Sequence, residues 1–250
     1  MSYTIAIAGK GGTGKTTIAS LLVRLIKENK LGSVLAVDAD PNSNLAEVLG
    51  VKPGRTIGNI LDDICAEPQK VPTGMSKDRF IEYEVQKAVQ EEDGFDVVSM
   101  GKPEGPGCYC YVNNVLRAVM AKLVNDYDYV IIDNEAGLEH LSRRTIRSAD
   151  VLLAVSDATA VGLKASSRIA AIVDELKIKV KNRLLLINRF DQEIDQSKVS
   201  QSNLQYIGNL PVDKEIARLS LEGISLWELK KDSLSLTALA KLGDKIWRQK

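Results

Sequence analysis

The sequence predicts an α/β fold: a doubly wound, mostly parallel sheet flanked by helices on both faces. Short apolar runs rich in β-branched residues alternate with longer amphipathic stretches along the chain. Such alternation is typical of right-handed strand–helix–strand units. Several of the runs are apolar throughout, as expected for strands that helices cover on both sides. Because ligands of such sheets bind at the carboxyl ends of the strands, the residues that follow each predicted strand are the candidate site.

The elements can be assigned in chain order. We expect strands at residues 3–8, 34–38, 95–100, 129–133, 151–155 and 183–188. Helical spacing predicts helices at residues 14–30, 113–125, 139–147 and 162–176. Residues 51–73 are expected to loop out because prolines and a glycine interrupt them, and residues 101–107 are rich in turn formers. Neither segment resembles a domain boundary, so we expect one domain over residues 1–250.

Composition argues against several functions. The 33 basic residues balance the 33 acidic ones, and aromatic residues make up 5% of the chain. We therefore expect neither nucleic acid nor an anionic membrane as a partner. The first residues lack the pattern of a secretory signal, and no apolar run approaches the ~20 residues of a membrane helix. Three cysteines are too few for a disulfide scaffold, so a cytoplasmic location is expected.

A phosphate-binding motif follows the first predicted strand. Its residues are Gly9, Lys10, Gly11, Gly12, Thr13, Gly14, Lys15, Thr16 and Thr17, in the pattern G-x-x-x-x-G-K-[ST]. The glycines let backbone N–H groups face phosphate oxygens, and the next helix presents its positive end to the same anion. We expect Lys15 to reach the β- and γ-phosphates, Thr16 to ligate Mg²⁺ and Thr17 to bond the α-phosphate.

Acidic residues end two further strands. Asp38 and Asp40 follow the second strand, one residue apart, and can face the same crevice, although an ordinary Asx turn would also explain them. Asp133 ends the run Tyr-Val-Ile-Ile-Asp, which suits a contact with Mg²⁺ through water. Lys10 is a further cation inside the loop, and the phosphate cradle itself does not need it. It is therefore either a second functional lysine or an ordinary solvated loop charge.

The loop Lys-Gly-Gly-x-Gly-Lys-Thr-Thr resembles the deviant Walker A loop of the MinD/ParA/nitrogenase-iron-protein superfamily of P-loop ATPases. This resemblance implies a homodimer that binds ATP or ADP with Mg²⁺, in which Lys10 reaches the partner's nucleotide. By the same resemblance Asp40 would orient the attacking water and Asp38 would hold the Mg²⁺ shell. Asp133 with Gly137 resembles the second switch, where a backbone amide meets the γ-phosphate.

The nucleobase site is also predicted from the resemblance. Relatives use an asparagine at the end of a late strand against the adenine edge, which implies Asn188, followed by Arg189. The turn that contains Pro211 resembles the one that closes over the base. From chemistry alone, Asn188 could equally be a turn residue at the end of a strand.

Cys108 and Cys110 flank Tyr109 after the turn-rich segment. In extended backbone both sulfurs lie on one side, where they suit a soft or borderline metal. A tetrahedral thiolate site needs four ligands, which a two-fold dimer would supply by contributing the pair twice. Two buried cysteines or a local redox pair are the alternatives. Cys65 is expected in the core, and His140 is expected to be a polar helix residue, not a ligand.

Two segments narrow the resemblance within the superfamily. Gly-Pro-Gly-Cys-Tyr-Cys-Tyr-Val-Asn-Asn and Asp-Asn-Glu-Ala-Gly-Leu-Glu-His-Leu-Ser-Arg resemble the CooC type, over essentially the whole chain. This implies an ATPase that promotes nickel insertion into a client, either carbon monoxide dehydrogenase or acetyl-CoA synthase, with Ni²⁺ or Zn²⁺ at an intersubunit Cys₄ site. The family often has Met where this chain has Asn134.

Two other functions compete with this reading. One is electron transfer through a cysteine-bridged iron–sulfur cluster, although the iron-protein relatives space their cluster cysteines tens of residues apart. The other is a positioning ATPase like MinD or ParA, which at a membrane would need a detachable basic amphipathic tail. Residues 233–250 have amphipathic spacing, but we expect their apolar face to pack on the domain.

Overall fold

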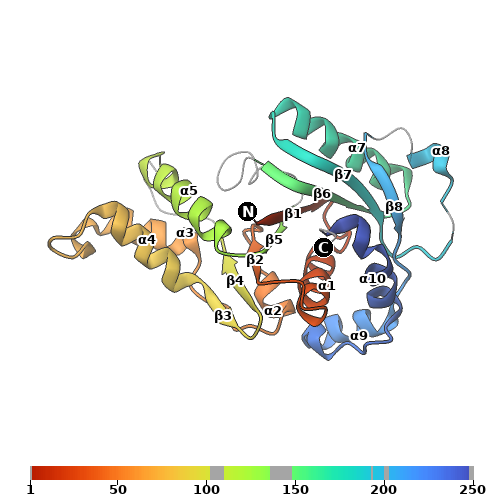
Figure 1. Ribbon diagram of the computed structural model, residues 1–250, viewed down its shortest axis with the longest axis horizontal. Helices are drawn as coiled ribbons and strands as arrows, with labels where there is room; N and C mark the ends of the chain where they lie inside the picture. Colours follow the sequence, from red (N-terminus) through yellow and green to blue (C-terminus); the bar gives the residue numbers. More distant parts are fainter. Residues whose placement is uncertain (1, 102–109, 136–147, 193, 200–202, 248–250) are drawn as a thin grey trace.

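The computed structural model describes residues 2–101, 110–135, 148–192, 194–199 and 203–247 (Figure 1). In this part of the chain eight strands form one sheet in the order β3-β4-β2-β5-β1-β6-β7-β8. Of their pairings, only that of β3 with β4 is antiparallel. The strands are β1 (Tyr3–Gly9), β2 (Val34–Asp38), β3 (Gln90–Glu92), β4 (Phe95–Ser99), β5 (Tyr129–Asp133), β6 (Ser148–Ser156), β7 (Lys179–Ile187) and β8 (Gln205–Asn209). The predicted fold class is confirmed.

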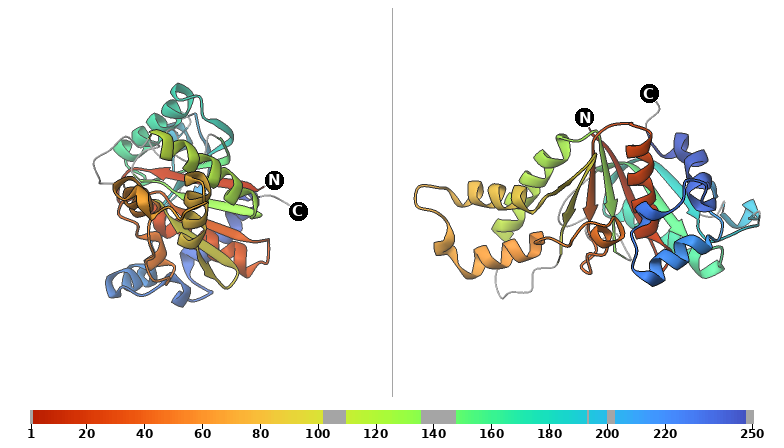
Figure 2. Two further views of the ribbon diagram at one scale, coloured as in Figure 1. Left: turned by 90° about the vertical axis from the view of Figure 1, so that its left-hand side faces the viewer. Right: turned by 90° about the horizontal axis from the view of Figure 1, so that it is seen from below.

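Helices cover both faces of the sheet. The described helices are α1 (Lys15–Glu28), α2 (Leu45–Val48), α3 (Ile57–Ala66), α4 (Lys77–Ala88), α5 (Cys110–Asn125), α7 (Ala160–Glu175), α8 (Gln196–Val199), α9 (Lys214–Glu222) and α10 (Leu234–Ile246), with the 3₁₀ turns η1 (Pro68–Lys70) and η2 (Leu226–Glu228). One core cluster joins the sheet to α1, η2 and α10, a second joins it to α3, α4, α5 and α7, and a smaller third lies between β6, β7, α7 and α8. Figures 1 and 2 show α3–α5 toward one end of the molecule and α9 and α10 toward the other.

The central strand β1 illustrates why the sheet is buried on both sides. Ile5 and Ile7 belong to the core cluster of α1, whereas the alternate residues Ala6 and Ala8 belong to the second cluster. All four are fully buried. Each isoleucine stabilises the fold by about 1.5–3 kcal/mol relative to an exposed side chain. Because β1 lies between β5 and β6 in the interior of the sheet, its end and the loop after it lie near the middle of the carboxyl edge of the sheet.

The prediction that residues 51–73 loop out is wrong for much of that segment, because α3 lies within it. Thr56 caps the helix by accepting from Asn59 N–H, and the Asn59 side chain returns to the Thr56 backbone in a capping box. Ile57, Ile60, Leu61 and Ile64 are buried with the spacing of one helix face. The prolines lie outside the helix, so they limit it without preventing it.

The C-terminal helix packs on the domain, as predicted for residues 233–250. Within α10, Leu236, Leu239 and Ile246 are buried in the core cluster of α1. Arg24 of α1 strengthens this side, because its guanidinium donates to Leu226 O at 2.8 Å and Leu229 O at 2.7 Å. None of the helices over the described ranges has the length and apolarity that crossing a membrane requires.

Candidate nucleotide-binding site

The loop between β1 and α1 has the backbone of a phosphate cradle. Gly12 has a φ of 81° and Gly14 a φ of 90°, both in the left-handed region that favours glycine. Gly14 is the N-cap of α1 and has no side chain to satisfy the first N–H groups of the helix. Those N–H groups, with the positive end of a helix of 14 residues, suit a bound phosphate.

The two lysines of the loop have different environments. Lys15 is buried, with 8% of its surface exposed, and its Nζ donates to Lys10 O at 3.4 Å. The Thr13 hydroxyl donates to the same carbonyl at 2.9 Å. The Lys10 side chain is exposed at the loop surface. Lys15 therefore points into its own cradle, whereas Lys10 is accessible from outside it.

Carboxylates from neighbouring strands meet beside the loop. In the sheet register Asp133 of β5 pairs with Asp38 of β2 on one side and with Ile7 of β1 on the other. Asp133 Oδ2 accepts a hydrogen bond from the Thr16 hydroxyl at 2.6 Å. Asp38 accepts the N–H of Leu45 at 2.8 Å and the N–H of Asp40 at 3.1 Å. Asp133 therefore contacts the phosphate loop directly, and Asp38 lies beside Asp133 at the end of the neighbouring strand.

Burial perturbs both acids. It raises the pKa of Asp38 to about 7; the nearby Asp133 charge adds to the rise, and the backbone donors Leu45 and Asp40 oppose it. Burial likewise raises the pKa of Asp133 to about 6, against the lowering effects of the Thr16 hydroxyl and the Lys15 charge. Both carboxylates would be favoured in the ionised form by a cation beside them.

The donor set fits Mg²⁺. Asp133 Oδ1 is buried and has no hydrogen-bond partner among the residues that the structure describes, so it has a free acceptor for a metal-bound water. Mg²⁺ keeps several waters and takes few protein ligands besides phosphate oxygens. Thr16 would hold the ion directly, and Asp38 and Asp133 would hold its waters. When bound, the ion would neutralise charge that develops on the phosphates during transfer.

Asp40 makes the Asx turn that was the alternative reading of its position. Its Oδ1 accepts the backbone N–H of Asn42 at 2.9 Å and the Asn42 side-chain amide at 3.0 Å. The side chain is half-buried beside Asp38. Its expected role toward the attacking water remains a prediction.

A cavity of about 190 Å³ lies beside the start of α1. Asn188, Arg189 and Pro211 line it, as expected for a base site, together with Thr17 and residues of α9 that the sequence analysis did not single out, Ile216, Ala217 and Ser220. The Asn188 amide donates to Thr13 O at 2.8 Å, so its first contact is with the phosphate loop. Its contact with adenine remains a prediction.

Asp213 secures the turn at the mouth of this cavity. Its Oδ1 accepts the N–H groups of Glu215 and Ile216 at the start of α9, at 3.0 and 3.4 Å. Its Oδ2 accepts the Ser233 hydroxyl at 2.6 Å and the Ser235 N–H at 3.1 Å at the start of α10. Burial raises the pKa of Asp213, but these donors outweigh it and hold the pKa below its usual value. Asp213 itself, a preferred N-cap residue, was a signal that could have located this helix start.

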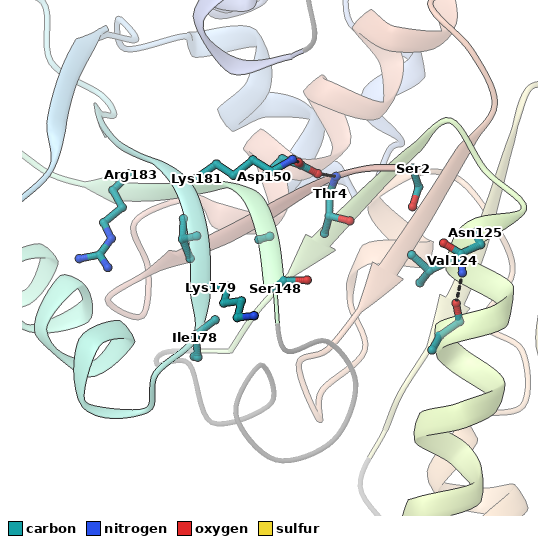
Figure 3. A pocket seen from close by; sticks show the side chains of 13 residues that line it. Ser2, Thr4, Val124, Asn125, Ser148, Asp150, Ile178, Lys179, Lys181 and Arg183 are labelled. Atoms are coloured by element: carbon teal, nitrogen blue, oxygen red, sulfur yellow. Dashed lines mark hydrogen bonds and ion pairs between the residues drawn. The ribbon is translucent and has the colours of Figure 1, made fainter.

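A larger cavity of about 790 Å³ lies elsewhere (Figure 3). Residues that begin β1, β6 and β7, including Thr4, Ser148 and Lys179, line it with the end of α5. It is therefore at the amino ends of the strands, opposite the phosphate loop. Asp150 in its wall is already engaged, because it accepts the Thr4 N–H at 2.8 Å and pairs with Lys181 at 2.5 Å. Strand direction and loop chemistry favour the smaller cavity as the nucleotide site.

Several predicted residues lie outside the described part of the chain. These are Cys108, Gly137 and His140, together with the predicted helix at residues 139–147. Cys110 begins α5. Cys65 is half-buried and packs against the core cluster of α3 and α5, close to its expected place. Over the ranges that the structure covers, no group of three or more His, Cys, Asp or Glu side chains could hold a metal ion.

Known proteins resemble the chain in sequence. The AAA-domain family matches residues 2–186. An uncharacterized ATP-binding protein of Methanocaldococcus jannaschii is 39% identical over 251 residues, which cover 98% of this chain and 99% of that protein. The carbon monoxide dehydrogenase accessory protein CooC of Rhodospirillum rubrum is 27% identical over 245 residues, or 90% of this chain and 89% of that protein.

Solved structures share the fold. The cell-division ATPase MinD of Pyrococcus furiosus aligns with a TM-score of 0.71 at 24% identity, over 98% of both chains. The septum site-determining protein MinD of Pyrococcus horikoshii, solved as a complex with Mg-ADP, aligns with a TM-score of 0.72 at 23% identity, over 98% of this chain and 96% of that one.

Proposed function

The chain belongs to the AAA-domain ATPases with the MinD/ParA fold, and on that basis we propose that it is an ATP-driven maturation factor for a nickel enzyme. The observation that carries the proposal is Cys108-Tyr109-Cys110 in a chain that is similar to CooC over 90% of its length. The client would be carbon monoxide dehydrogenase or acetyl-CoA synthase, and the location cytoplasmic.

A tetrahedral metal site at the cysteine pair would require a dimer. Two thiolates leave a tetrahedral site half complete, and a two-fold axis through the pair would supply the other two. The metal, Ni²⁺ or Zn²⁺, would be cargo at this shared site. Cys110 begins α5, which follows β4 in the chain, and β4 lies next to β2 in the sheet; this supports a location of the pair on the same side of the sheet as Asp38 and Asp40, at the end of β2.

The nucleotide would control the same dimer. Lys15 would bind the β- and γ-phosphates of its own MgATP, and Gly137 would meet the γ-phosphate through its backbone. The exposed Lys10 would reach the nucleotide of the partner. A cation supplied across an interface accelerates related phosphoryl transfers by roughly 10³–10⁵. Hydrolysis would remove the γ-phosphate, and with it the contacts that hold the two subunits together, and so open the dimer.

Metal stoichiometry tests the proposal. Anaerobic protein loaded with Ni²⁺ or Zn²⁺ should hold one ion per dimer, and X-ray absorption should give four sulfur ligands, at ~2.3 Å for zinc. Cys108→Ser and Cys110→Ser should each abolish tight binding, whereas Cys65→Ser is the matched control and should not. A first shell without sulfur, or full stoichiometry in both variants, would refute the shared site.

A positioning ATPase is the second candidate, favoured by the similarity to MinD structures over 98% of the chain. The packing of Leu236, Leu239 and Ile246 against the core counts against a detachable membrane-binding tail. ATP-dependent co-sedimentation with anionic liposomes, or with DNA, would support this candidate. An iron–sulfur cluster would instead give visible absorbance in anaerobically purified protein.

A further inference from the structure

The end of β7 is joined to the phosphate loop at two consecutive carbonyls. The Asn188 amide Nδ2 donates to Thr13 O at 2.8 Å. A terminal nitrogen of the Arg189 guanidinium donates to Gly12 O at 3.3 Å. The two residues are also linked to each other, since the Arg189 N–H donates to Asn188 Oδ1 at 3.0 Å. Two neighbouring residues of one strand end thus hold two neighbouring peptide groups of the loop.

These contacts fix the direction in which the loop presents its donors. In a planar trans peptide, the C=O of one residue and the N–H of the next point in opposite directions. Because Thr13 O is turned toward Asn188, the Gly14 N–H is turned away from β7 and into the cradle. That N–H immediately precedes α1, where free helix N–H groups bind anions.

We infer that Asn188 and Arg189 are positioning residues for phosphate binding, acting through the backbone of Gly12 and Thr13. The inference requires the nucleotide site but not the metal site proposed above. It differs from a base contact, which would act on the nucleobase alone. The two side chains also line the cavity of about 190 Å³, so a base and the phosphate loop would share the same support.

The surrounding structure is consistent with a fixed support. Asn188 is 8% exposed, and its N–H donates to Ser156 O at 2.7 Å, which anchors it to the end of β6. Arg189 has a φ of 57°, in the left-handed region where a side chain costs roughly 1–3 kcal/mol. In that conformation its backbone N–H meets Asn188 and its guanidinium meets the loop. A Cβ on Gly14 would lie 2.5 Å from Asn188 Nδ2, so the amide occupies the space that glycine leaves.

A ligand without a base separates positioning from base recognition. Isothermal titration calorimetry would measure the affinity of magnesium tripolyphosphate and of MgATP for the wild type and for Asn188→Ala. Loss of a neutral hydrogen bond should weaken tripolyphosphate binding about three- to tenfold, with at least the same loss for MgATP. Asn182→Ala, an exposed asparagine earlier in β7, is the matched control and should bind both ligands as the wild type does.

Two outcomes would overturn the inference. One is Asn188→Ala that loses MgATP affinity but keeps tripolyphosphate affinity, which would make Asn188 a base contact only. The other is unchanged affinity for both ligands. Arg189→Ala, at an exposed position, provides a second reading if Asn188→Ala does not fold, and it should weaken tripolyphosphate binding by about two- to threefold because its bond is longer.

Discussion

Gly12→Ala and Gly14→Ala form a paired test of how tightly the phosphate loop is held against β7. Both glycines have positive φ, 81° and 90°, so alanine at either position incurs a left-handed strain of roughly 1–2 kcal/mol. Their surroundings differ. A Cβ on Gly12 would meet nothing within 4 Å, whereas one on Gly14 would lie 2.5 Å from Asn188 Nδ2.

The difference between the variants therefore reports the Asn188 contact. In Gly14→Ala the amide must move and lose its bond to Thr13 O, which costs about 1 kcal/mol, and a buried polar group left unpaired adds to that loss. Gly14→Ala should thus be about 1–2 kcal/mol less stable than Gly12→Ala. In a chain of 250 residues this corresponds to a melting temperature lower by roughly 2–8 °C.

Urea unfolding of the protein without nucleotide is the appropriate assay, because it excludes contacts of the new methyl groups with phosphate. The slopes of the two transitions should agree, so that the midpoints compare stability directly. Equal destabilisation of the two variants would show that the Asn188 side chain can move away from the new methyl group with no loss of stability. It would refute the reasoning that the amide is held firmly against the loop.

Three further predictions concern the acids and the exposed lysine. Lys10→Ala should bind MgATP within a few-fold of the wild type, since Lys15 and the backbone cradle remain, but should hydrolyse it much more slowly; near-normal turnover would exclude a role across the dimer. Asp40→Ala should bind ATP and accumulate an ATP-bound dimer, which light scattering would detect; a monomer at saturating ATP would contradict this. Asp38 and Asp133 have pKa values raised to about 7 and 6, so the folded protein keeps protons that the unfolded chain releases, and these groups should lower stability as the pH rises from about 4 to 7. Asp38→Asn should flatten that fall in the melting temperature, and Mg²⁺ should stabilise the wild type more at pH 8 than at pH 5; an unchanged pH profile in Asp38→Asn would show that burial perturbs the acid less than its position indicates.

The centre of the site could be predicted from the sequence because its geometry is local. A loop of nine residues contains its own turn and helix start, and parallel strands bring Asp38 and Asp133 to one edge of the sheet whatever the details of packing. The contact of Asn188 with Thr13 could not be predicted in this way. The two residues are 175 positions apart, and only the packing of β7 beside β6 and of β6 beside β1 brings them together.

The helix α3 shows a different limit of prediction from sequence. Its capping box and its apolar spacing are both present in the sequence, but the prolines around it outweighed them in the prediction.

The short edge strands β3 and β8 were missed for a physical reason. β3 has three residues and is Gln-Glu-Glu in sequence, so its pairing with β4 comes from the backbone and leaves no apolar pattern.

The shared cap at Asp213 has a consequence for how the C-terminal part of the chain opens. A single carboxylate accepts donors from the first turn of α9 and from the first turn of α10, so a displacement of Asp213 would release both helix starts together. We expect the amides of Ile216 and Leu236 to exchange with solvent in one cooperative event, as members of the same unit of local unfolding. The wall of the cavity of about 190 Å³ would then open as a whole, in a single step that a ligand in the cavity would oppose.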